Sequence, residues 1–186
     1  IQSLSESFAD DSPQIDFGDG SLLIYSHLYS LPEGETVEPY PVAKIEAWDW
    51  SKANIRVESQ GTTKRADSVQ RTVIEALLTD PDPYDVIFDD DGKGEIADVV
   101  ALRITDSVVS VTLFHCKYSG ADTPGTRLSD LYEVCGQAQK SARWRDRPNR
   151  MLQHMLKREQ KRRDRGVSSR IEHGSAAAIK KLKAGW

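Results

Sequence analysis

Cysteine is scarce in this chain, and long apolar runs are missing from it. Only Cys116 and Cys135 occur among the 186 residues. Their spacing fits no metal-binding pattern, so we expect two free thiols in a cytoplasmic protein, with a single disulfide as the alternative. No run of about 18 apolar residues is present, so we expect no membrane span. Neither a charged-then-apolar leader nor a G-x-x-x-x-G-K-[ST] loop occurs, so nothing indicates secretion or a nucleotide-driven motor.

Charge is abundant, and its two signs are separated along the chain. Residues 1–142 contain 11 Lys and Arg against 25 Asp and Glu, whereas residues 143–186 contain 14 against 4. A basic segment beside an acidic body is typical of proteins that bind a polyanion such as nucleic acid. A solvated basic helix is the alternative interpretation.

The pattern of apolar residues predicts an α/β protein with three parts. Residues 1–64 form a β-rich extension, in which residues 21–31, 38–50 and 53–59 are predicted strands. Residues 65–145 form the core, and residues 146–186 form a basic helical segment in which no strand is predicted.

Within the core, residues 65–80 show apolar residues at helical spacing, with Asp67 or Ser68 as the N-cap. Three strand-like runs follow, at residues 84–90, 95–105 and 108–119. The "TDS" stretch between the last two runs predicts a hairpin. A second helix is predicted within residues 126–144.

The predicted hairpin would bring three functional side chains together. Asp98 lies near the start of its first strand, and His115 and Lys117 lie at the end of the second. Side chains two residues apart on a strand share a face, so these three should gather at one end of the sheet. A carboxylate and an imidazole can hold a divalent cation, while a lysine can stabilise charge on a phosphate. The arrangement indicates metal-assisted phosphodiester hydrolysis.

This pattern resembles the PD-(D/E)xK restriction-endonuclease-like superfamily over residues 65–144. The tripeptide "IAD" supplies the acidic residue Asp98, and "HCK" stands at the (D/E)-x-K position with Lys117 as its lysine. The resemblance implies an α-β-β-β-α-β core with a mixed sheet flanked by helices. It also implies a metal-dependent DNA endonuclease, the cleavage module of a larger cytoplasmic defence or restriction-type protein with a helicase or NTPase module elsewhere.

The resemblance assigns roles to individual residues. Asp98 and His115 would bind Mg²⁺ or Mn²⁺, and Lys117 would act at the scissile phosphate. Gln70 on the first helix would orient a ligand or a water molecule; Glu75, about 140° further around the helix, is the alternative acid. His115 stands where the family usually has an acid or a glutamine, and imidazole suits Mn²⁺ better than Mg²⁺. No strand pattern appears after residue 146, so we expect the family's fourth core strand either beyond residue 186 or among the N-terminal strands.

Nucleic-acid contacts are expected on the second helix and the basic segment. Gln137 and Lys140 resemble the phosphate-contacting pair that some members carry, and plain helix surface is the alternative. The basic segment would contact the DNA backbone through Arg143, Arg145, Lys157, Arg158, Lys161, Arg162 and Arg163. Trp144 could stack on a base or pack over a helix end.

Other interpretations of the chain remain open. The fold could bind nucleic acid, DNA or RNA, without cleaving it, or its basic tail could bind an acidic protein. A Cys116 nucleophile paired with His115 is unfavourable, because adjacent strand residues face opposite ways. The segment "DDDGKGE" (residues 89–95) lacks EF-hand spacing and is predicted to be a solvated turn.

Overall fold

The computed structural model describes residues 14–17, 21–24, 27–30, 41–105, 108–125 and 127–184. The chain divides into two units, residues 1–48 and 49–186. This division differs from the boundaries predicted after residues 64 and 145, because residues 49–64 and 146–184 belong to the same unit as the core. None of the described helices combines the length and the apolar character needed to cross a bilayer.

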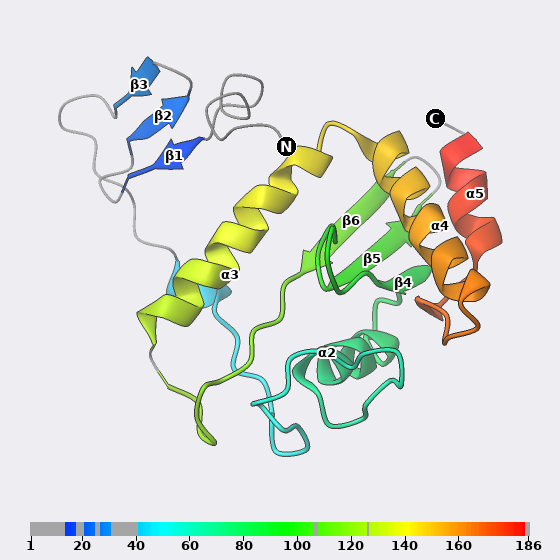
Figure 1. The fold of residues 1–186 in the computed structure, drawn as a ribbon, viewed down its shortest axis with the longest axis horizontal. Helices are drawn as coiled ribbons and strands as arrows, with labels where there is room; N and C mark the ends of the chain where they lie inside the picture. Colours follow the sequence, from blue (N-terminus) through cyan, green and yellow to red (C-terminus); the bar gives the residue numbers. More distant parts are fainter. Residues whose placement is uncertain are drawn as a thin grey trace. The chain divides into compact units, whose positions relative to one another are not determined.

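The first unit contains a small antiparallel sheet. Its strands β1 (Ile15–Asp16), β2 (Leu22–Ile24) and β3 (His27–Tyr29) lie in the order β1-β2-β3 (Figure 1). The predicted strand at 38–50 is wrong over its described part. There the chain forms the short 3₁₀ helix η1 (Val42–Lys44) and irregular structure, because Pro41 supplies no backbone N–H for a sheet.

The second unit is an α/β domain with one four-stranded sheet. Its elements, in chain order, are α2 (Val69–Leu78), β4 (Val86–Asp89), β5 (Val99–Ile104), β6 (Val109–Phe114), α3 (Leu128–Ser141), η2 (Ala142–Trp144), α4 (Pro148–Asp164), β7 (Ile171–His173) and α5 (Ala176–Ala184). The sheet order is β6-β5-β4-β7. The predicted helix-strand-strand-strand-helix order is therefore confirmed.

The residues before α2 form no strand, contrary to the prediction for 53–59. Their carbonyl groups instead accept hydrogen bonds from the first N–H groups of α2. Val69 N donates to Val57 O, and Gln70 N donates to Glu58 O. The Ser68 hydroxyl caps the helix by accepting from Arg71 N at 3.1 Å. Because these carbonyl groups accept hydrogen bonds from the helix terminus, they are not available to pair with a strand.

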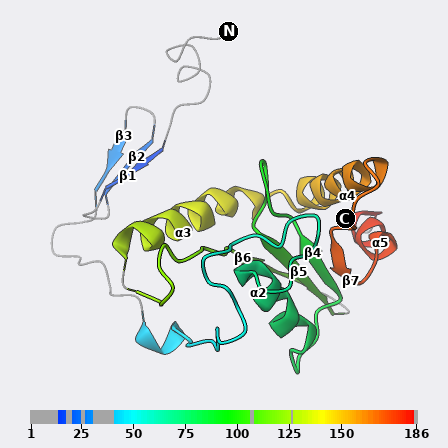
Figure 2. The ribbon, with the colours of Figure 1, turned by 60° about the horizontal axis from the view of Figure 1, so that its bottom comes forward.

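Every strand pairing in the four-stranded sheet is antiparallel, so the prediction of a mixed sheet is wrong. The predicted hairpin is confirmed, with Val99 opposite Phe114 and Ile104 opposite Val109. A fourth strand, β7, lies in the segment where no strand was predicted, and it pairs with the outer edge of β4. Figure 2 shows β7 beside β4.

Helices cover both faces of this sheet. On one face, Val86, Phe88, Val100 and Leu102 pack in one core with Met151, Leu152 and Met155 of α4 and Ile179 of α5. The opposite face, with Ile87, Val99 and Ala101, is also fully buried, and α2 contacts β4. Since residues alternate between faces, Asp98 belongs to the α4 face and Asp89 to the α2 face.

Candidate active site

The end of the β5–β6 hairpin places Asp98 and His115 side by side. Continuing the register one residue beyond the Val99–Phe114 pair sets these two opposite each other. His115 Nδ1 lies 3.6 Å from Asp98 Oδ2, and both side chains are almost completely buried. The predicted proximity of the carboxylate and the imidazole is therefore confirmed.

Ser141 contacts the second nitrogen of the His115 ring. The Ser141 oxygen lies 3.0 Å from His115 Nε2, and the hydroxyl group donates to the Ile96 carbonyl. His115 Nδ1, which faces Asp98, is buried and has no hydrogen-bond partner among the described residues. A cation between this nitrogen and the carboxylate would satisfy both groups.

Two further carboxylates reach the same place from the loop between β4 and β5. Ligand oxygens of Asp91, Glu95 and Asp98 lie within 4.8 Å of one another, a group that could hold a metal ion. Asp98 Oδ2 also accepts from Cys116 N at 2.8 Å, and Glu95 Oε2 accepts from Gly92 N at 2.7 Å. The prediction of a solvated turn at 89–95 is therefore wrong for Asp91 and Glu95, and also for Asp89 and Asp90, which are completely buried.

Burial and mutual repulsion raise the pKa of two of these carboxylates. Burial raises the pKa of Asp91, and the neighbouring charges of Asp89 and Asp98 raise it further against the opposing Ser59 hydrogen bond. Burial and the charge of Asp98 likewise raise the pKa of Glu95. The three carboxylates form a group that could hold a metal ion, and the imidazole of His115 lies beside one of them, Asp98. Carboxylate oxygens suit Mg²⁺, whereas an imidazole nitrogen suits Mn²⁺ better.

These groups line one cavity of about 350 Å³. From α3, Gln137, Lys140 and Ser141 contribute to its wall, and Glu58 contributes from the segment before α2. Gln137 Oε1 is buried without a partner among the described residues. The structure thus brings the predicted residues Asp98, His115, Gln137 and Lys140 into one site.

Lys117 lies at the edge of this site and does not line the cavity. Its Nζ lies 2.7 Å from Glu133 Oε1 and 3.4 Å from Glu58 Oε2. Burial lowers the pKa of Lys117, but the two glutamates outweigh this effect and the pKa lies above the ordinary lysine value. Lys117 is therefore a cation at neutral pH, connected to the cavity through Glu58.

Gln70 lies on the α2 side of the sheet, behind the site. Its Nε2 donates to Asp89 Oδ1 and to the Asp98 carbonyl, both at 3.0 Å, and its Oε1 accepts from Gln60 N at 2.9 Å. It is 1% exposed, so both ends of the amide are bonded to protein. Glu75 points away, with 58% of its side chain exposed, and pairs with Arg71.

Two predicted phosphate-binding arginines turn out to support the loop that carries Asp91 and Glu95. Arg158 donates to the carbonyl groups of Asp90, Asp91, Gly92 and Lys93 at 2.6 to 3.3 Å. Arg162 is 7% exposed and pairs with Asp89 at 3.0 Å. We correct their assignment, because these guanidinium groups are used within the protein.

The other predicted nucleic-acid residues lie at several places. Arg143 and Lys157 line a cavity between η2 and α4, Lys161 and Arg165 line another cavity, and Arg145 is exposed. Arg163 pairs with Glu159 at 2.8 Å.

Both cysteines are free thiols. Burial raises the pKa of the Cys116 thiol well above its usual range, which opposes a role as nucleophile.

Glu58, Asp91 and Glu95 are the site residues that sequence reasoning missed. Asp91 and Glu95 could have been found from one signal in the sequence, a run of three aspartates at the end of a buried strand, followed by two glycines. The comparisons give no further guide: no family model, curated protein or solved structure matches this chain.

Proposed function

We propose that this chain is a metal-dependent nuclease domain that hydrolyses phosphodiester bonds of DNA, with a PD-(D/E)xK-like active site of variant HxK type. The observation that carries the proposal is His115 Nδ1, which is buried without a hydrogen-bond partner among the described residues and lies 3.6 Å from Asp98 Oδ2. Asp98 also belongs with Asp91 and Glu95 to a group of carboxylates that could hold one metal ion.

Each residue has a distinct part in this proposal. Asp91, Glu95, Asp98 and His115 would hold the cation, which when bound polarises the phosphate and activates water. Lys140 and Gln137, which line the cavity from α3, would position the phosphate. Lys117 would balance negative charge at the edge of the site, because it stays protonated.

The choice between Mn²⁺ and Mg²⁺ follows from the ligand set. The imidazole favours Mn²⁺, and the three carboxylates admit Mg²⁺ with lower affinity. A cytoplasmic parent protein with a helicase or NTPase module is part of the proposal that derives from the family resemblance alone.

The first test measures metal binding by variants that keep the shape of the side chain. Calorimetric titration with Mn²⁺ should show binding to the wild type and a loss of at least about tenfold in affinity for Asp98→Asn and Asp91→Asn. Glu75→Gln is the matched control, since it removes an exposed carboxylate outside the cavity and should leave affinity unchanged. Equal titrations for all four proteins would contradict the proposed site.

The second test measures cleavage. Supercoiled plasmid incubated with Mn²⁺ should be nicked by the wild type and by Glu75→Gln, and not by Asp98→Asn or Lys117→Met. A protein that binds DNA but neither binds Mn²⁺ nor nicks the plasmid would instead be the nucleic-acid-binding alternative. Two features favour that alternative: His115 replaces the usual oxygen ligand, and Lys117 pairs with Glu133.

A further inference from the structure

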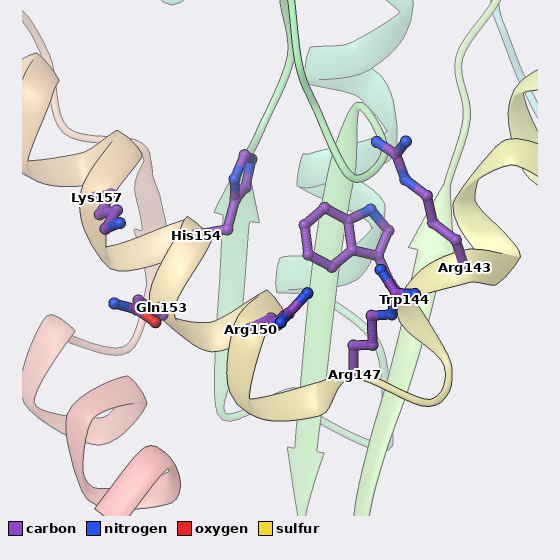
Figure 3. A pocket seen from close by; sticks show the side chains of 7 residues that line it. All are labelled: Arg143, Trp144, Arg147, Arg150, Gln153, His154 and Lys157. Atoms are coloured by element: carbon purple, nitrogen blue, oxygen red, sulfur yellow. The ribbon is translucent and has the colours of Figure 1, made fainter. Parts of the chain in front are cut away.

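A second cavity, of about 390 Å³, lies between η2 and the first half of α4. We call it the Trp144 cavity. Its lining residues are Arg143, Trp144, Arg147, Arg150, Gln153, His154 and Lys157. Figure 3 shows the indole of Trp144 in the middle of these side chains, with Arg143 on one side and His154 on the other.

The charge of this cavity is positive and uncompensated. Four cations line it, no carboxylate does, and none of the four side chains forms an ion pair with a residue that the structure describes. By contrast, Arg158, Arg162 and Arg163 on the same helix are all paired. The N-terminus of α4, at Pro148, adds the positive end of a helix dipole. Grouped like charges cost stability, and a bound anion removes that cost.

The aromatic residues give the cavity a second chemical character. The rings of Trp144 and His154 lie 5.2 Å apart at 46°, and the Arg143 guanidinium lies 5.5 Å from the indole. Trp144 packs against the hydrophobic core, and its Nε1 is buried without a hydrogen-bond partner among the described residues. Burial and the charge of Arg158 lower the pKa of His154, so its ring is neutral at pH 7.

We propose that the Trp144 cavity binds an unpaired nucleotide of a single-stranded nucleic acid, with the base stacked on Trp144 and the flanking phosphates held by the four cations. Basic residues around an aromatic ring are the combination that binds single strands. In a duplex the faces of each base are covered by its neighbours, so only an unpaired base can use the indole.

The cavity lies next to the loop that carries the candidate metal ligands. His154 Nε2 is 4.0 Å from Asp90 Oδ2, and Asp90 directly precedes Asp91. A strand held at Trp144 would therefore lie near this loop. This inference rests on the proposed function and deepens it, because it names unpaired strand as the form of nucleic acid that the chain contacts.

The first experiment tests the role of the base. Fluorescence anisotropy in EDTA, which prevents cleavage, compares a labelled single strand of about 12 nucleotides with an abasic strand of equal length and with a duplex. The wild type should bind the single strand at least about fivefold more tightly than the abasic strand. Trp144→Leu, which keeps apolar bulk, should abolish that difference. Equal affinity of the wild type for all three probes would overturn the proposal.

The second experiment tests the cations without altering the core. Arg147→Ala and Arg150→Ala together should weaken single-strand binding at least about tenfold and reduce the salt slope by about 1.4. Lys180→Ala and Lys181→Ala together form the matched control, because they remove two exposed cations from α5, outside the cavity. The control should change the affinity less than twofold. An equal loss in both double variants would refute a specific site.

The outcomes for this cavity and for the metal site are independent. The arginine double variant should titrate Mn²⁺ like the wild type, so that its defect belongs to strand binding alone. If the protein binds the single strand more tightly than the abasic strand but does not bind Mn²⁺, this inference is supported and the nuclease proposal is contradicted. A chain that binds Mn²⁺ and nicks plasmid, yet treats the three probes alike, would keep the nuclease and lose this inference.

Discussion

Arg158 on α4 forms an ion pair with Asp90, a carboxylate that is completely buried between β4 and β5. Burial raises the pKa of Asp90 to about 7, although the charge of Arg158 opposes this rise. The same guanidinium group donates to four successive carbonyl groups of the loop from Asp90 to Lys93. A residue 67 positions away from Asp91 thus fixes the loop that presents two of the candidate metal ligands.

Arg158→Lys should therefore weaken metal binding although Arg158 touches no ligand oxygen of the cluster. A lysine keeps the charge but cannot reach four carbonyl groups, because it lacks the planar fork of the guanidinium group. We expect a loss of about 10- to 100-fold in Mn²⁺ affinity by calorimetry. Arg165→Lys, on an exposed arginine just after the same helix, is the control and should bind Mn²⁺ like the wild type. An unchanged affinity in Arg158→Lys would show that the loop holds its shape without this contact.

Replacing His115 should change the choice of metal. His115→Asp exchanges the imidazole nitrogen for a carboxylate oxygen, so the ratio of Mn²⁺ to Mg²⁺ affinity should fall by about tenfold or more. His115→Ala should weaken both metals. The exposed His173 on β7 provides the control, since His173→Ala removes an imidazole outside the cavity. A metal preference that is the same in His115→Asp and the wild type would exclude His115 as a ligand.

Gly174, directly after β7, should tolerate no side chain. Its φ is +81°, and a Cβ atom there would overlap the Asp85 carbonyl oxygen. Gly174→Ala should lower the free energy of unfolding by roughly 2 to 4 kcal/mol in urea titrations. Gly136→Ala in α3 is the matched control, because a Cβ there meets no atom within 4 Å. That substitution should stabilise the protein by about 0.5 to 1 kcal/mol.

Glu159 should make the stability of the protein depend on acid pH. Burial alone would raise its pKa, but Arg163, the Arg170 amide and Ser169 donate to the carboxylate and hold the pKa below its usual value. The stability that Glu159 contributes is therefore present above the unfolded-state pKa and is lost as the pH falls through the lower folded-state pKa.

Unfolding measured between about pH 6 and about pH 3 should reveal this contribution. Glu159→Gln should be less stable than the wild type at pH 6, and the gap should narrow as the pH falls. Asp146→Asn removes an exposed carboxylate before α4 and is the control. Its free energy of unfolding should change with pH in the same way as that of the wild type. A gap that stays constant down to pH 3 would assign the loss to packing instead of charge.

Local pattern was enough to predict the part of the site built on the hairpin. Alternating residues and a short turn fix the β5–β6 register, and the register alone sets Asp98 opposite His115. The positions of Asp91 and Glu95 depend on Arg158 and the buried Asp90, which are long-range contacts that composition does not contain. An acidic, glycine-rich loop looks solvated in sequence because the residue that orders it lies on a distant helix.

The strand β7 escaped prediction for a similar reason. Three residues are too few to show an alternating pattern, and Ile171 and His173 become a strand only by pairing with β4.

Gln70 illustrates the opposite case. The sequence suggested that Gln70 on the first helix orients a ligand or a water molecule, but its contacts are formed by loop and strand atoms on the α2 side of the sheet.

The late position of β7 in the chain has a consequence for how this domain can be divided. Until residues 171–173 have emerged, β4 has an open side, with backbone groups of a fully buried strand free to pair with another polypeptide. A fragment that ends after α3 would expose that side together with the apolar surface that α4 and α5 cover. It should self-associate in solution, whereas a fragment that extends through residue 184 should stay dispersed.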